Sequence, residues 1–239
     1  MNHSFLKLII AITPPPPSTF KLDMSGANGQ VEMTMPVQIL ILLTLLTFLP
    51  AIIMSLSSFT RIIIVFHFLR QAIGTQEAPS NQILIGLALF LSFFVMNPTL
   101  TAMYSNAYEP WSKGEIDQLQ AVDRAVGPLK LFMLKSTREK DLQLFVETSG
   151  GPKPKGPEDL PMRVVMPAFM ISEIKTAFQI GFVLFLPFLV IDMVVSSVLL
   201  SMGMMQLPPV MVSLPFKVLL FIMVDGWNLV ISSLVKSYV

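Results

Sequence analysis

The chain contains no cysteine, only two histidines and few charged residues, which make up 13% of its 239 residues. The absence of cysteine excludes disulfide frameworks and thiolate metal sites. A histidine-based metal or catalytic site would have to use almost the whole supply of His3 and His67. A soluble domain has roughly 25% charged residues, whereas this chain is 53% hydrophobic with a mean hydropathy of +0.69. Its net charge of +1 gives no bulk attraction to nucleic acid. We therefore expect a membrane protein that holds no metal or cofactor and binds no nucleic acid.

Hydrophobic and polar stretches divide the chain into four parts. The expected parts are an N-terminal segment at 1–35, two hydrophobic segments within 36–104, a polar module at 105–171 and a hydrophobic hairpin at 172–239. In the first part, Lys7 interrupts a short apolar stretch and a run of four prolines follows. We interpret this part as disordered or as a weak or truncated signal peptide, because its apolar stretch is shorter than the usual core of roughly 7–15 residues.

The first hydrophobic segment, at about 37–69, is too long for one straight membrane helix. At ~1.5 Å per residue it would measure about 50 Å, whereas the hydrocarbon core of a bilayer is ~30 Å thick. Pro50 lies in its middle, where it removes a backbone hydrogen-bond donor. We therefore predict a kinked helix or a tight helical hairpin. The second segment, at about 82–104, also lacks charged residues.

The polar module differs in kind from its neighbours, since nine basic and nine acidic residues balance each other within 105–171. Apolar residues recur in it at helical spacing. We predict two amphipathic helices that are broken at Gly127–Pro128. A loop rich in proline and glycine is expected to follow at 149–161.

The short loop at 70–81 indicates the orientation in the membrane. It carries Arg70, and Arg61 lies in the segment before it. Basic residues of short loops tend to stay on the cytoplasmic side. The loop is therefore expected in the cytoplasm, with the polar module and both termini outside.

Ionisable residues lie inside or at the edge of the hydrophobic segments of the C-terminal part. They are Glu173, Asp192, Lys217 and Asp225. Charge at membrane depth is costly, so such residues normally face a protein interior, a partner or a water-filled path. This pattern indicates an assembly that moves something rather than an anchor that faces lipid.

Asp192 and Asp225 lie on adjacent hydrophobic segments, as the two carboxylates of an intramembrane aspartyl protease would. Their flanking sequences, IDMV and VDGW, do not resemble the signatures of those proteases. A single aspartate in a span is more often a hydrogen-bond acceptor or a member of an ion pair. We therefore expect that the chain is not an enzyme.

Lys217 needs a partner from another segment or another subunit. Asp225 is eight residues away, which is ~12 Å along a helix and too far for a direct salt bridge. Glu173 is a natural counter-ion, but a hairpin would put it and Lys217 at opposite ends within one chain. An ion pair between subunits is the better hypothesis, and the alternative is that Lys217 extends to the membrane interface.

A short turn rich in methionine separates the last two hydrophobic segments. Met202, Met204 and Met205 surround Gly203 in this turn. Methionine is flexible and fills irregular gaps, so such a cluster could seal a hole and still yield. Packing at a helix end would give the same pattern, and the residues alone leave both interpretations open.

Three long stretches of sequence are more specific than these single residues. They read SSFTRIIIVFHFLRQAIGTQEAPSNQILIGLALFLSFFVMNP, PAFMISEIKTAFQIGFVLFLPFLVIDMVVSSVLLSMGMM and PPVMVSLPFKVLLFIMVDGW. They closely resemble the FliP family of flagellar type III export proteins, which has homologues in the injectisome. The resemblance is nearly uninterrupted over each stretch and is therefore far more specific than a short motif.

The resemblance implies an all-α protein of membrane-associated helical hairpins with a small amphipathic-helical insert outside the membrane, which assembles into a ring or helical pore. The implied partners are further copies in a ring, expected to be a pentamer, with FliQ, FliR, FlhB and FlhA. The implied function is that of a structural pore subunit of the flagellar export gate, which conducts unfolded flagellar proteins across the inner membrane at the basal body. The polar module is then expected on the periplasmic side.

The resemblance also implies a channel gate in the methionine loop. The constriction that seals the pore would fall on Met204 and Met205, with Met202 and Gln206 beside them. Gln206 stands where many relatives have a third methionine, so this layer of the seal differs here.

The same resemblance supports the ion pair between subunits that would join Glu173 to Lys217. It assigns no role to the other charges expected to be buried, which are Asp192, Asp225 and Arg61. The rival interpretation is a subunit of an ion channel or secondary transporter, which would explain these charges equally well. It does not explain the polar module, and the chain has no inverted internal repeat of the kind common in transporters.

Overall fold

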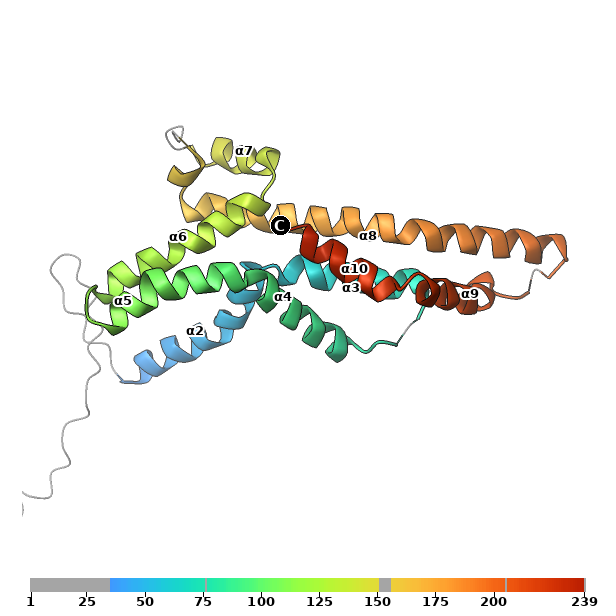
Figure 1. Cartoon of the computed structure of the whole chain (residues 1–239), viewed down its shortest axis with the longest axis horizontal. Coiled ribbons are helices and arrows are strands. Elements are labelled where there is room, and N and C mark those ends of the chain that lie inside the picture. The colour runs from blue at the N-terminus through green and yellow to red at the C-terminus, as the bar shows by residue number, and fades with distance from the viewer. Residues whose placement is uncertain (1–34, 76, 151–155, 205, 239) are drawn as a thin grey trace, which may run out of the picture. The chain divides into compact units, whose positions relative to one another are not determined.

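The computed structural model describes residues 35–75, 77–150, 156–204 and 206–238 (Figure 1). The chain divides into two units, residues 1–52 and 53–239. All regular structure in the described stretches is helical, which confirms the expectation of an all-α protein with apolar helices. Apart from Met35, the segment expected at 1–35 lies outside the described residues.

The first unit contributes one described helix, α2 (Met35–Ser55), whose last residues belong to the second unit. The helix continues through Pro50, so the break is not at the proline. The first hydrophobic segment is nevertheless broken, as predicted, because α2 ends at Ser55 and the next helix begins at Phe59. It ends beside Ser57 and Thr60, whose hydroxyls each donate to the carbonyl oxygen of Met54 at 3.2 Å. Such hydroxyls compete with backbone N–H groups for the helix carbonyls, which favours a helix end at this point. Proline at position 50 removes only its own N–H donor, and the helix continues past it.

α3 lies at the centre of the second unit. It spans Phe59–Ile73, and its main contacts are with α4 (Asn81–Met103), α8 (Met162–Ser201) and α9 (Pro209–Met223). The buried residues of α3 recur every three or four positions and include Ile62, Val65, Phe66, Leu69, Ala72 and Ile73. This spacing forms an apolar stripe, and residues of the neighbouring helices complete the main core around it.

A second core lies under the polar module. It is formed by α6 (Gln118–Ser136), α7 (Glu139–Thr148) and the first part of α8, and buried Met133 and Phe169 belong to it. α6 runs through Gly127–Pro128, so the break predicted there is wrong, and the helix ends before Thr137. Contacts of α6 with α4 and α8 outweigh the preference of these residues to end a helix, which is about 1 kcal/mol for glycine and about 3 kcal/mol for proline.

The loop expected after the module is described only in part. Residues 151–155 lie outside the described residues, and the short helix η2 (Pro157–Asp159) follows them. α8 then begins at Met162, ten residues before the start of the hydrophobic hairpin expected at 172–239.

α8 and α9 form the C-terminal hairpin. α8 has 40 residues and is therefore about 60 Å long. Figure 1 shows α9 and α10 (Gly226–Lys236) returning along it. α9 and α10 are separate helices because Asp225 between them has a φ of 50°, in the left-handed region. This break was not expected from the hydropathy pattern.

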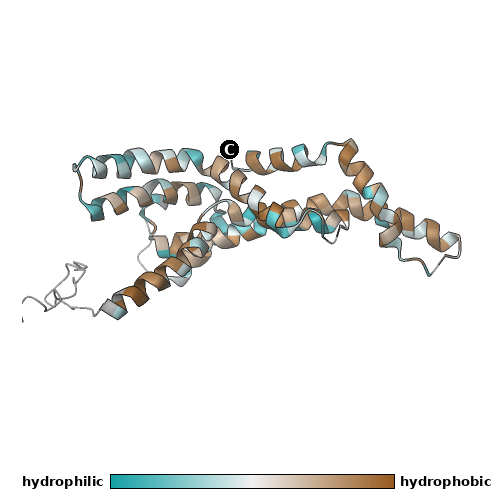
Figure 2. Ribbon diagram, turned by 90° about the horizontal axis from the view of Figure 1, so that it is seen from below, coloured by the Kyte–Doolittle hydropathy of each residue, from teal (hydrophilic) through white to brown (hydrophobic). Residues whose placement is uncertain are grey.

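Two described helical stretches are long and apolar enough to cross a membrane. They are Asn81–Ser112, which joins α4 to η1 (Tyr104–Tyr108) and α5 (Glu109–Ser112), and Met162–Ser201. Two bent pairs of helices would raise the number to four if each pair were one span. Figure 2 shows apolar residues over most of α8 and α9 and polar residues gathered on α6. The apolar helices agree with the expected membrane-associated helices, and the division of the chain into four parts stays a prediction.

Candidate functional site

The methionine loop forms the tip of the hairpin between α8 and α9. Gly203 has a φ of 71°, and its N–H donates to the carbonyl of Leu200 at 3.1 Å. The N–H of Met204 donates to the carbonyl of Leu199 at 3.0 Å. These two bonds form a Schellman motif, which closes a helix end with a left-handed glycine. The turn is therefore built by the backbone and does not depend on the methionine side chains.

The side chains of the loop that the structure describes are exposed. Met202 is 64% exposed and Met204 is 44% exposed, and Gln206 is exposed as well. Met205 lies outside the described residues. Since the loop is held by its backbone, its methionines are available for contacts beyond this chain.

Lys217 ties the two helices of the hairpin together. Its Nζ lies 2.6 Å from Oδ2 of Asp192 on α8, and the hydroxyl of Ser213 donates to Oδ1 of the same carboxylate at 2.5 Å. Nζ also donates to the carbonyl of Ala72 at the end of α3, at 3.2 Å. The side chain of Lys217 is 4% exposed and that of Asp192 is 31% exposed.

A second group of charges lies at the other end of the core, where Arg61 of α3 meets Glu173 of α8. Their side chains are 3% and 0% exposed. Nε of Arg61 donates to Oε2 of Glu173 at 3.0 Å, and Nη2 binds Oε1. Nη1 of Arg61 donates to the hydroxyl of Ser237 at 2.8 Å and to its carbonyl at 3.2 Å. The guanidinium group thus uses all three of its nitrogens.

Tyr238 completes this charge group. Its hydroxyl donates to Glu173 and lies 3.3 Å from the carbonyl of Ser58. Its ring lies under the guanidinium of Arg61, at 3.8 Å from centroid to Cζ, and stacks on Phe132 of α6. Burial, and after it the negative charge of Glu173, raise the pKa of Tyr238 well above its ordinary value. The phenol therefore stays protonated and remains a hydrogen-bond donor.

The structure gives partners within the chain to four of the five charged residues singled out from the sequence. Within one chain, Glu173 binds Arg61 and Lys217 binds Asp192. Glu173 and Lys217 do not pair with each other within the chain, as the hairpin argument expected. A single chain contains no neighbouring subunit, so the pair between subunits stays a prediction. The low exposure of Lys217 argues against its extension to the membrane interface.

Asp225 behaves differently from the other charges. Its side chain is exposed in the single chain, and its backbone carbonyl accepts the N–H of Leu229 at 3.1 Å. Its residue type suits the turn, because aspartate tolerates the left-handed conformation better than most residues. In the described part of the chain, the carboxylate of Asp192 binds Ser213 and Lys217, and no described hydrogen bond joins it to Asp225.

Sequence reasoning did not identify Ser213, Ser237 and Tyr238. Ser213 lies four residues before Lys217, a spacing that places two side chains on one face of a helix. This signal could have been used. Ser237 and Tyr238 follow α10 without any local pattern, and only their contact with Arg61 shows what they do.

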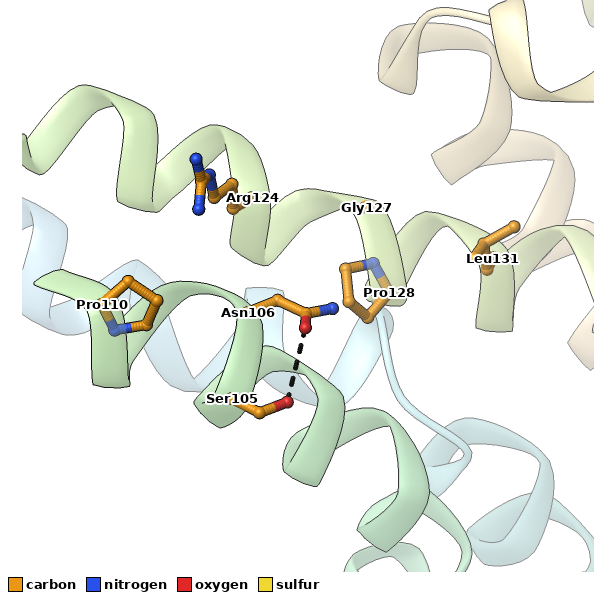
Figure 3. A pocket seen from close by; sticks show the side chains of 7 residues that line it. All are labelled: Ser105, Asn106, Pro110, Arg124, Gly127, Pro128 and Leu131. Carbon is orange, nitrogen blue, oxygen red and sulfur yellow. Dashed lines mark hydrogen bonds between the residues drawn. The ribbon is translucent and has the colours of Figure 1, made fainter. Parts of the chain in front are cut away.

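An open groove lies between the end of the α4 span and α6 (Figure 3). Its lining consists of Ser105, Asn106, Pro110, Arg124, Gly127, Pro128 and Leu131. The hydroxyl of Ser105 is bonded to the side chain of its neighbour Asn106 at 3.4 Å. Arg124 is the one ionisable residue of this lining, so the groove brings together no nucleophile with an acid or base.

Comparisons with known proteins place these features in a family. The profile of the FliP family matches residues 42–234. The flagellar biosynthetic protein FliP of Pectobacterium carotovorum subsp. carotovorum is 54% identical over 211 residues, which cover 88% of this chain and 82% of the relative. The chain belongs to the FliP family.

FliP proteins of two further bacteria give the same result. Those of Cereibacter sphaeroides and Bacillus subtilis (strain 168) are 50% and 52% identical over 217 residues, or 91% of this chain. The matches cover 72% and 98% of the two relatives. As a member of the FliP family the chain is a structural protein of flagellar export and not an enzyme. The matched range contains both charge groups except for Ser237 and Tyr238.

Proposed function

We propose that this chain is a pore subunit of the flagellar export gate, through which unfolded flagellar proteins cross the inner membrane. The observation that carries this proposal is the exposed methionine loop at the tip of a long apolar hairpin. Membership of the FliP family supplies the flagellar context. The gate consists of several copies in a ring, expected to be a pentamer, together with FliQ and FliR.

The surface of the hairpin supports assembly into a ring. Large apolar side chains are exposed along both helices, among them Phe178, Phe182, Val190, Val194, Phe216 and Ile222. A bilayer covers only ~30 Å of apolar length, about half the length of α8. Exposed apolar surface beyond that length needs other protein to cover it. Neighbouring copies and the two partner proteins provide this cover.

The methionine loop is the constriction of the proposed pore. Methionine side chains are flexible, so a ring of them excludes water when closed and moves aside for an extended chain. The Schellman turn at Gly203 keeps the backbone in place while the side chains move. Met202, Met204 and Met205 form this seal, and Gln206 contributes a polar layer beside it.

The remaining assignments follow the same proposal. The gate lies in the inner membrane at the flagellar basal body, with the polar module on the periplasmic side. FlhB and FlhA are further neighbours of the gate. An ion pair between subunits, from Glu173 to Lys217, is possible only if assembly exchanges the partners that each residue has within one chain.

Co-expression with FliQ and FliR, followed by purification in mild detergent and native mass spectrometry, tests the assembly. A discrete complex with several copies of this chain and both partners is the expected result. A monomer, or an oligomer of this chain that ignores both partners, would contradict the proposal and favour an ion channel or transporter.

The seal is tested by ion leak through the assembled gate. We expect the double substitution Met204→Ala and Met205→Ala to raise the leak, because alanine leaves the constriction open. Leu229→Ala, at an exposed apolar position on α10, is the control and should leave the leak unchanged. Equal leak in the wild type and the double variant would remove the seal from the proposal.

Charge reversal tests the pair between subunits. Lys217→Glu should block assembly, and Glu173→Lys in the same chain should restore part of it if the two residues meet across subunits. Lack of any recovery in the double variant would leave only the partners seen within the chain.

A further inference from the structure

The contacts around Lys217 lie between the methionine loop and the rest of the chain. Asp192 precedes Met202 by ten residues on α8, which corresponds to about 15 Å along the helix. Among the described residues between Asp192 and the methionine loop, no other hydrogen bond joins a side chain of α8 to α9. The bonds of Asp192 to Ser213 and Lys217 are therefore the first polar link between the two helices below the loop.

Lys217 also connects this link to α3. The last carbonyls of a helix have no donors within it. The N–H of Gly74 donates to the carbonyls of Arg70 and Gln71 at 3.2 Å and 3.1 Å. The carbonyl of Ala72 instead accepts a hydrogen bond from Nζ of Lys217 at 3.2 Å. A cation is favoured at this end of a helix by the helix dipole. The ammonium group thus holds α8 and the end of α3 at the same time.

The end of α3 is itself fixed to the start of α4. Nη1 of Arg70 donates to Oδ1 of Asn81 at 2.6 Å and to the carbonyl of Pro79 at 3.4 Å. A continuous series of polar contacts therefore runs from the start of α4 through the last turn of α3 to the hairpin. No neighbouring subunit is needed to complete it.

We infer that Asp192, Ser213 and Lys217 are positioning residues that fix the position of the methionine loop relative to the end of α3. The name clip is used below for these three residues. The inference rests on the proposed function for the meaning of the loop, but the contacts belong to the single chain. Apolar contacts alone allow two helices to slide by small steps, whereas a partly buried ion pair with an added hydroxyl and carbonyl favours one register.

The chain offers matched variants for a test. Asp192→Asn keeps the size of the side chain but removes its charge, and Asp192→Glu keeps the charge. Ser196→Ala is a control on the same helix, because the hydroxyl of Ser196 bonds only to its own helix, at the carbonyl of Asp192 and 2.7 Å away.

Hydrogen–deuterium exchange of the assembled complex, measured by mass spectrometry, reports how firmly the clip holds the methionine loop. Asp192→Asn should speed exchange in peptides that contain the amides of Met202 and Met204 by about tenfold or more, since hydrogen bonds to charged groups are involved. Peptides from the middle of α3 should not change. Asp192→Glu should restore most of the protection, and Ser196→Ala should match the wild type.

Two results would overturn the inference. One is unchanged exchange of the loop in Asp192→Asn, and the other is an equal rise in the loop and in α3, which would mean general loss of stability. Ion leak through the same complexes separates the clip from the proposed function. A loop that loosens without any rise in leak supports the clip and contradicts the seal.

Discussion

Breaking the buried pair of Arg61 and Glu173 should destabilise the chain more than any change at a surface charge. Both side chains are almost fully buried, and Arg61 has no other carboxylate among the contacts described for it. Glu173→Gln removes the negative charge but keeps the shape of the side chain. The guanidinium group is then buried without a counter-charge.

The expected loss of unfolding free energy is about 3–5 kcal/mol, which is the usual cost of removing one partner from a buried ion pair. Glu173→Gln should lie near ~3 kcal/mol, because the amide oxygen still accepts one hydrogen bond from Arg61. Arg61→Met should lie nearer ~5 kcal/mol, because only Tyr238 then remains to donate to the carboxylate. Replacing both residues by methionine should recover part of the loss, because no unpaired charge is left in the core.

Unfolding of the purified chain in detergent, followed by far-ultraviolet circular dichroism during titration with sodium dodecyl sulfate, measures these differences. Glu109→Gln is the control, since the pair of Glu109 with Lys113 is exposed, at 43% and 57%. It should unfold at the wild-type midpoint. If Glu173→Gln also kept that midpoint, the buried pair would not exist in the folded chain. If the double methionine variant were no better than Arg61→Met, lost packing rather than an unpaired charge would explain the cost.

Three further predictions concern single positions, and the same unfolding assay checks them. Tyr238→Phe should cost about 1.5–3 kcal/mol, because it removes a donor to a charged group but keeps the ring, and no loss would show that the hydroxyl is not bound. Gly181→Ala should cost about 1–3 kcal/mol, because the new Cβ would lie 2.6 Å from the ring of Phe68. Gly86→Ala, with nothing within 4 Å, should stabilise α4 by ~0.5–1 kcal/mol, and equal effects at both glycines would contradict the close packing. Asp225→Val should cost about 1–3 kcal/mol because of its left-handed backbone, whereas Asp225→Asn should be tolerated, and equal stability of the two variants would refute the backbone explanation.

The sequence alone predicted where the helices lie, but not where each of them ends. Long apolar runs can satisfy their backbone only as helices in a membrane, so the hydrophobic segments were identified from composition. Proline at position 50 and the pair Gly127–Pro128 were expected to break helices and did not. The observed breaks depend on local hydrogen bonds at Ser57 and on a left-handed residue at Asp225, which are too small to appear in hydropathy.

The methionine loop was predicted as a turn from its residues, and the structure added its geometry. Glycine is the usual residue just past the end of a helix, and Gly203 has the left-handed conformation found there. The exposure of Met202 and Met204 could not be predicted, because packing at a helix end would give the same residues. Whether these methionines are exposed or packed depends on which residues lie opposite the loop in the folded chain.

The sequence determined that the charges in the hydrophobic segments need partners, because an isolated charge is too costly in an apolar environment. Only the tertiary structure decided which partners they have. Arg61 and Glu173 are 112 residues apart in the chain, and Asp192 and Lys217 are 25 residues apart. Neither separation has a periodic signal, since each pair meets only because α3 and α9 both pack against the same long helix, α8. The need for a counter-ion is a property of each residue and its neighbours in sequence, whereas the identity of that counter-ion is a property of the packed helices.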